Sequence, residues 1–226
     1  MDALKCIAVF ALIAGSPACA GSLAVSPLRI TFTKAAEITS LTVENTGQEE
    51  ALVQLETFAW TQAGAEHKLG PTDDVIAVPP VFRLKPGTQQ RVRVGLTRAF
   101  TDKTEQTFRL TVTEVPMATK PGTVAVAVRH SLPIFVRPVS PISSNLTLKA
   151  ASPSALEIAN NGSEHMRIHR WRLRDSANAV IVEGEGPGYL LGGASQLIAL
   201  GPHRVAGRMV FEADSDARTL KIDVGQ

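Results

Sequence analysis

A run of alternating residues, 123–138, constrains the fold of this chain more than any other stretch. Val124, Val126 and Val128 alternate with alanines. Because side chains at every second position of a β-strand share one face, the run predicts a strand with one apolar face. The same register continues through four further positions: His130, Leu132, Ile134 and Val136.

Pro133 lies inside this predicted strand. Proline has no N–H to donate to a neighbouring strand, so within sheets it occupies edge strands or bulges. An apolar edge strand can pair with another chain, and most proteins blunt such an edge. An ordinary half-buried strand and a strand displayed to a partner both fit the alternation, which does not distinguish between them.

The rest of the chain after residue 20 also consists of short β-branched runs bounded by turns, and helix signals are almost absent. In the first half the predicted strands cover 28–32, 41–44, 51–58, 90–94 and 107–114. The turn sequence Lys120-Pro121-Gly122 makes the last of these a neighbour of strand 123–138. About seven such strands in about 115 residues favour an immunoglobulin-like β-sandwich.

A second β-domain is predicted beyond the proline-rich segment 137–141, which suits a short hinge. There the strand pattern restarts at 146–149, 156–159, 166–173, 179–183, 196–200, 205–212 and 219–224. Asn160-Asn161-Gly162 is a hairpin signal. We therefore predict an all-β protein with two immunoglobulin-like β-sandwich domains, at 21–139 and 140–226.

Residues 1–20 have the features of a secretory signal peptide. Lys5 supplies the positive start, residues 7–14 form an apolar stretch too short to span a bilayer, and Ala18-Cys19-Ala20 fits the cleavage rule. Cys19 leaves a lipoprotein-type signal open as an alternative. We expect export to the periplasm, and no other stretch predicts a transmembrane helix.

Composition restricts the function further. Both cysteines, Cys6 and Cys19, fall within the signal, so the exported chain has no disulfide and each domain depends on its apolar core. The formal net charge is +2, which is near balance and does not favour nucleic acid as a partner.

No motif in the sequence indicates catalysis or a cofactor. His165 and His169 have the spacing of zinc ligands on a helix, but their neighbours predict a strand, where four positions span about 13 Å. We expect two surface histidines and no metal site. Gly184, Gly186 and Gly188 lack the dinucleotide-binding spacing, so we expect no cofactor and no enzyme activity.

Several segments, in order along the chain, resemble the periplasmic chaperones of the chaperone–usher pilus pathway, a PapD-like superfamily. VPPVFRLKPG at 78–87, followed by QRVRV at 90–94, is similar to the family's Pro-Pro-x-Phe-x-Leu-x-Pro-Gly segment and Val-Arg-Val strand. IFVRP at 134–138 is similar to the Leu-Phe-Tyr-Arg-Pro end of its donor strand. Trp60-Thr61-Gln62 resembles the archaic branch. The resemblance implies two sandwiches in a boomerang arrangement.

The resemblance also implies a mechanism. A pilus subunit of this family lacks its last strand, and the chaperone lends its own edge strand before delivering the subunit to an outer-membrane usher. Val124, Val126 and Val128 would fill the subunit's pockets, with Leu132 as a fourth. The implied partners are secreted pilus subunits and the usher, and self-association through the donor edge stays open.

Arg29 matches the family's first-strand arginine, which anchors the subunit's terminal carboxylate, a group that a guanidinium suits. The usual lysine partner is replaced here by Pro133, and three substitutes stay open: Arg129, Arg91 and Arg93.

Glu114, Arg137 and Asp214 match a family ion network that fixes the angle between the domains. Because Glu114 and Arg137 close neighbouring strands, we expect them to lie close together. Asp216, two residues from Asp214, leaves the third member open.

Two other functions fit the same fold. A non-catalytic two-domain adhesion or scaffold module would be stable without a secreted subunit. A periplasmic hydrolase would need a nucleophile–base pair, which the sequence does not show.

Overall fold

The computed structural model describes residues 23–116, 127–143 and 145–224, and that part of the chain contains strands and no helix. The predicted all-β class is therefore confirmed. The proposed signal peptide lies outside the described residues. In the described part of the chain, no helix is long and apolar enough to pass through a bilayer.

The first ten strands form a two-sheet sandwich. They are β1 (Leu23–Ser26), β2 (Ile30–Phe32), β3 (Ile38–Asn45), β4 (Ala51–Ala63), β5 (Glu66–Pro71), β6 (Val75–Val78), β7 (Val81–Leu84), β8 (Gln89–Leu96), β9 (Gln106–Val115) and β10 (Arg129–Val136). One sheet has the order β1-β3-β8-β6, and the other has the order β2-β10-β9-β4-β5 with β7 paired to β4. Alternate residues of each strand, such as Val92 and Val94 of β8, are buried between the sheets.

The last seven strands form a second sandwich. They are β11 (Leu146–Ser152), β12 (Ala155–Asn160), β13 (Met166–Arg174), β14 (Val180–Leu190), β15 (Ser195–Ala199), β16 (Val210–Ser215) and β17 (Thr219–Asp223). The sheet orders are β11-β12-β15 and β14-β13-β16-β17. Each of these strands overlaps one of the seven strands that the sequence predicts after residue 145.

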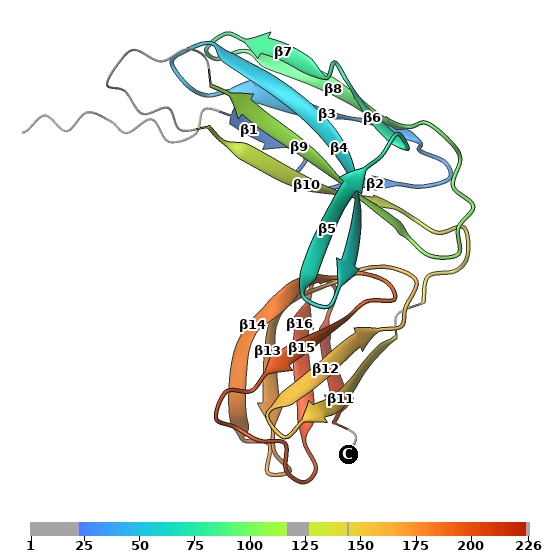
Figure 1. Cartoon of the computed structure of the whole chain (residues 1–226), viewed down its shortest axis with the longest axis vertical. Coiled ribbons are helices and arrows are strands. Elements are labelled where there is room, and N and C mark those ends of the chain that lie inside the picture. The colour runs from blue at the N-terminus through green and yellow to red at the C-terminus, as the bar shows by residue number, and fades with distance from the viewer. Residues whose placement is uncertain (1–22, 117–126, 144, 225–226) are drawn as a thin grey trace, which may run out of the picture.

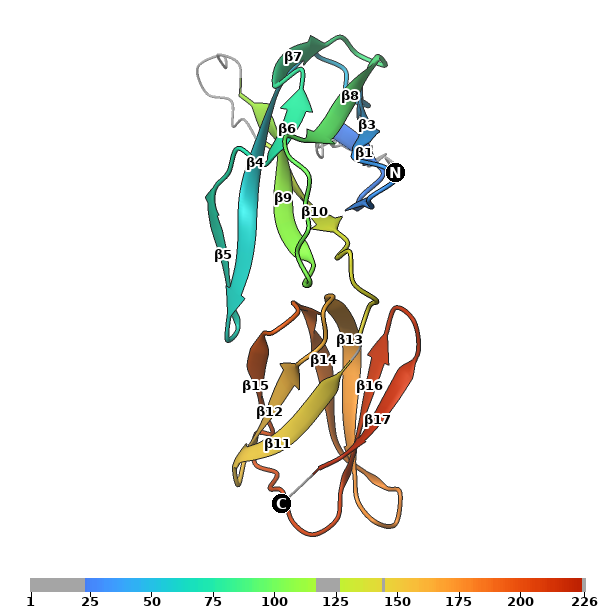
Figure 2. The same ribbon diagram turned by 90° about the vertical axis from the view of Figure 1, so that its right-hand side faces the viewer.

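The two sandwiches meet end to end at an angle, in the boomerang arrangement that the resemblance implies (Figures 1 and 2). The long β4–β5 hairpin extends from the first domain towards the second (Figure 2), and β9 separates it from β10. Trp60 and Phe135 of the first domain are fully buried in a hydrophobic cluster that otherwise consists of second-domain residues. The domains therefore share apolar contacts as well as a linker.

Strand β10 pairs along its whole length with β9, which confirms the predicted neighbours over the described residues 129–136. On its other side, β2 covers only Ile134–Val136. Within the described residues, the segment 129–133 has no strand on that side. Pro133 is the last residue of this unpaired segment. It lies opposite Arg109 without a register shift, so it makes no bulge.

The expectation of a hairpin at Asn160-Asn161-Gly162 is wrong, because β12 and β13 belong to different sheets. Asn160 is buried, and its side-chain amide donates to the carbonyls of Glu164 and Leu190 while its oxygen accepts from the N–H of Gly162. The residue ties together the chain segments that pass from one sheet to the other.

Candidate functional site

A cleft of about 430 Å³ lies where the two domains meet. From the first domain, Arg29, Glu105 and Arg137 line it, and from the second domain His165 and Asp216 face them. Arg167 and Arg218 add two further cations to the lining. The cleft therefore combines several guanidinium groups with a few acids, a composition suited to an anionic group.

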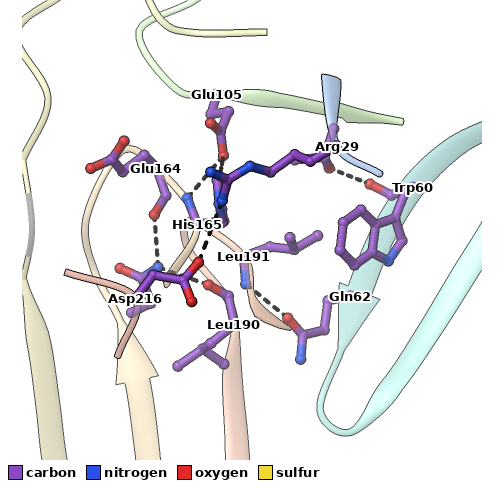
Figure 3. Close-up of polar contacts among 11 residues, drawn as sticks. Arg29, Trp60, Gln62, Glu105, Glu164, His165, Leu190, Leu191 and Asp216 are labelled. Atoms are coloured by element: carbon purple, nitrogen blue, oxygen red, sulfur yellow. Dashed lines mark hydrogen bonds and ion pairs between the residues drawn. The ribbon is translucent and has the colours of Figure 1, made fainter. Parts of the chain in front are cut away.

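Arg29 reaches across this cleft from the segment between β1 and β2 (Figure 3). Its Nη1 lies 3.4 Å from Oδ2 of Asp216, which belongs to the turn between β16 and β17. The other oxygen of Asp216 lies 2.5 Å from Nε2 of His169. Arg29 therefore lies between the two domains, and its partner there is an acid of the same chain.

A second contact between the domains joins Glu105 to His165 (Figure 3). The Glu105 side chain is only 2% exposed, and its Oε2 accepts from the backbone N–H of His165 at 2.9 Å and lies 2.7 Å from His165 Nδ1. The His165 ring stacks on Phe135 with a centroid separation of 3.5 Å. His165 is therefore not the surface residue that the sequence suggests, because the facing domain covers it.

Aromatic rings continue this interface. Tyr189 packs against Trp60 edge-on at 5.5 Å and against Phe135 at 5.6 Å between centroids. The Arg109 guanidinium lies 3.7 Å from the centre of the Trp60 ring, a cation–π contact. Burial lowers the pKa of Arg109. Burial first, and the Arg109 charge second, lower the pKa of His67, whose Nδ1 accepts from the Trp60 indole N–H.

The end of the β4–β5 hairpin also forms hydrogen bonds with the second domain. Gln62 Oε1 accepts from the backbone N–H of Leu191 at 2.9 Å, and its amide nitrogen lies 3.4 Å from Oε1 of Gln196 (Figure 3 for the first contact). Together with the Glu105–His165 contact at the hinge, this fixes the domains at two separate places.

The predicted ion network is wrong in two of its three members. The backbone N–H of Glu114 bonds to Val128, whereas Arg137 follows Val136, so roughly 30 Å of antiparallel strand separates the two side chains. The carboxyl-terminal ends of antiparallel neighbours lie at opposite ends of the pair, which excludes the expected contact. Glu105 is the β9-side acid that shares the cleft with Arg137.

Asp214, the third predicted member, belongs to the second domain's own sheet. Its Oδ2 lies 3.2 Å from Nη1 of Arg172, and its Oδ1 accepts from the hydroxyl of Thr219. Asp216, the alternative that the sequence leaves open, is the residue that reaches the cleft.

Two residues of the predicted donor set, Val124 and Val126, lie outside the described residues. Val128 is half-buried and remains next to the free edge. Leu132 is 2% exposed and packs within the first domain's own core, so its prediction as a fourth donor side chain is wrong. Leu132, Ile134 and Val136 alternate because all three side chains pack into the core of the first domain.

The structure also limits which cation could replace the lysine that the family has at Pro133. Arg91 and Arg93 lie on β8, in the sheet that does not contain β10, and Arg91 bonds to the Ser40 hydroxyl. Arg129 begins β10, eight positions before Arg137. Arg137, Arg167 and Arg218 line the same cleft as Arg29. Periodicity could not identify them, because their proximity depends on the angle between the domains.

His165 and His169 contact different acids, Glu105 and Asp216. Across residues 23–116, 127–143 and 145–224, no three His, Cys, Asp or Glu side chains are grouped closely enough to hold a metal ion.

Comparison with known proteins identifies the family. A model of the PapD N-terminal domain, from pili and flagellar-assembly chaperones, matches residues 22–141. Chaperone protein FimB/FhaD of Bordetella pertussis is 30% identical over 181 residues, which is 71% of each chain. Chaperone protein FaeE of Escherichia coli is 31% identical over 121 residues, 52% of this chain and 44% of that one.

Solved structures give the same answer for the fold. The CsuC–CsuE chaperone–tip adhesion subunit complex, from archaic chaperone–usher Csu pili of Acinetobacter baumannii, includes a chain that matches with a TM-score of 0.67 at 21% identity. The match covers 89% of this chain and 97% of that one. The chain therefore belongs to the PapD family of pili and flagellar-assembly chaperones.

Proposed function

We propose that this protein is a periplasmic chaperone that binds pilus subunits by lending them the edge of β10, and that it delivers them to an outer-membrane usher. The observation that carries the proposal is the free edge at 129–133, which is paired with β9 on one side and meets no other strand of the described residues on the other. An open backbone edge can add a strand of another chain, with hydrogen bonds for affinity and alternating side chains for specificity.

Val124, Val126 and Val128 are proposed as the side chains that enter the subunit. They precede the described edge in the same alternating register as Leu132, so they continue the face that β10 directs into the first domain's core. A subunit docked beside that core would receive them as an extension of it. Burying each valine would contribute about 1.5–3 kcal/mol.

We propose that Arg29 anchors the subunit's terminal carboxylate, and that Arg137 is the second cation of the cleft in place of the missing lysine. A fixed charge at one end of the pairing would select one register, because a strand of repeated Val-Ala units can slip by two residues and present the same face. The role is non-catalytic, and we place the domain division at 139–140. We also propose that the chain belongs to the archaic branch of the family.

Val126→Asp tests the donor strand. The charge would enter an apolar pocket without a partner, so we expect the subunit recovered with affinity-tagged protein from periplasm to fall by about tenfold or more. Val180→Asp is the matched control, because Val180 is an exposed valine of β14 in the other domain. Equal subunit recovery for the two variants would remove the valines that precede β10 from the binding role and would favour the adhesion or scaffold alternative.

A further inference from the structure

We propose that Asp216 is an internal competitor for Arg29: in the free protein its carboxylate occupies the guanidinium that a partner's terminal carboxylate would use. This inference rests on the anchoring role proposed above for Arg29. It adds a condition to that role, because the incoming group must displace a carboxylate of the chaperone's own second domain.

The geometry of the pair supports a stand-in ligand. Arg29 projects from the first domain and Asp216 from the facing turn of the second, and both line the cleft (Figure 3). Asp216 is the one ion-pair partner that Arg29 has among the described residues. A side-chain carboxylate and a chain-terminal carboxylate are the same chemical group, so both can accept from one guanidinium.

The contact is also built to be displaced. One oxygen of Asp216 meets one nitrogen of Arg29 at 3.4 Å, a long single contact that leaves the other guanidinium N–H groups of Arg29 for a ligand. A terminal carboxylate that approaches in a two-point geometry would therefore bind more strongly. The Asp216 and Arg29 side chains are 41% and 51% exposed, so water can solvate both during the exchange.

Asp216 has a second partner that remains after displacement. Its Oδ1 contacts His169, and the turn that carries it is closed by hydrogen bonds between Ser215 and Arg218. The displaced carboxylate thus stays at the mouth of the cleft, ready to return when the partner leaves. A ligand whose carboxylate does not reach Arg29 cannot displace Asp216 and is disfavoured. A segment that pairs with β10 and at the same time places its terminal carboxylate on Arg29 is favoured.

The test uses the purified protein and two peptide probes at low ionic strength, where exposed charges are least screened. Both probes are acetylated peptides of alternating valine and threonine; one ends in a free carboxylate and the other in an amide. NMR titration follows the side-chain Nε–Hε signal of Arg29 where that residue is present and, in every variant, the backbone amide signals of β10. We expect Asp216→Asn to bind the carboxylate probe about two- to fivefold more tightly than the wild type, the range that one exposed ion pair provides.

Asp223→Asn is the matched control, because it removes the same charge from the second domain in an exposed pair with Arg208 outside the cleft. It should leave both affinities unchanged, and Arg29→Gln should abolish the preference for the carboxylate probe. If Asp216→Asn binds no more tightly than Asp223→Asn, the competitor role fails while anchoring by Arg29 survives. If the wild type binds the two probes equally, or binds neither, the anchoring role fails and this inference fails with it.

Discussion

Individual residues at the domain junction show how the structure differs from its sequence pattern. His67 is neutral in its contact with Trp60: an indole N–H can only donate, so the His67 Nδ1 that it meets at 3.1 Å must accept. Protonation of His67 would place two donors against each other. Burial and, second, the nearby Arg109 charge also disfavour the protonated ring, and they lower the pKa of His67.

This arrangement predicts a pH dependence of stability. Because the folded-state pKa of His67 lies below the unfolded value of about 6.5, the unfolded chain binds the extra proton first. The contribution of neutral His67 to the free energy of unfolding is then fully present above about pH 6.5. It decreases as the pH falls from there towards the folded-state pKa. Urea unfolding at pH 7.5 and 5.5 measures the effect, and His67→Gln should show a smaller loss than the wild type. An equal loss in both proteins would assign the pH dependence to other groups.

At the scale of elements, the two sandwiches use the same device where the chain passes between sheets. Asn45 bonds to the carbonyls of Glu49 and Leu84, as Asn160 bonds to those of Glu164 and Leu190. Each asparagine is buried, and its own carbonyl accepts from a glycine with positive φ, Gly87 or Gly193. The sequence shows no obvious repeat, but both domains solve the crossing with one buried amide.

Asn160→Ala should be strongly destabilising, because it leaves buried backbone groups without partners. We expect a loss of about 2–3 kcal/mol in the free energy of unfolding, measured by urea titration. Asn161→Ala, next in the chain and exposed, should cost about 0.5 kcal/mol or less, since its side chain bonds to the Thr147 hydroxyl at the surface. Similar losses for the two variants would show that the buried amide does not hold the crossing.

The elements also show what the sequence can and cannot predict. All seven strands of the second domain are predicted, because their apolar residues alternate and turns bound them. Strand β5 is missed, because its residues are exposed along nearly its whole length and no apolar alternation marks it. Glu105 is missed as a site residue for another reason: its partner His165 is 60 positions away, in the other domain, and periodicity gives faces but not such contacts.

At the scale of the whole molecule, the shared core predicts that the domains unfold together. Phe135→Ala removes a fully buried ring from the second domain's cluster and the stacking surface of His165. Calorimetry of the wild type should show one transition, and Phe135→Ala should split it into two. Phe108→Ala is the control, because it truncates the same side chain inside the first core and should lower the transition temperature without splitting it. Two well-separated transitions in the wild type would contradict the coupling.

The burial of Trp60 and Phe135 in the second domain's cluster also bears on how such proteins can recombine. A crossover at the proline-rich hinge would join a foreign second domain to these two rings. The incoming domain would have to supply its own equivalents of Tyr189 and His165 to cover them. The two domains must therefore be inherited together with their junction. Chimaeras between relatives should fold only when β4, β5 and β10 are exchanged together with the second sandwich.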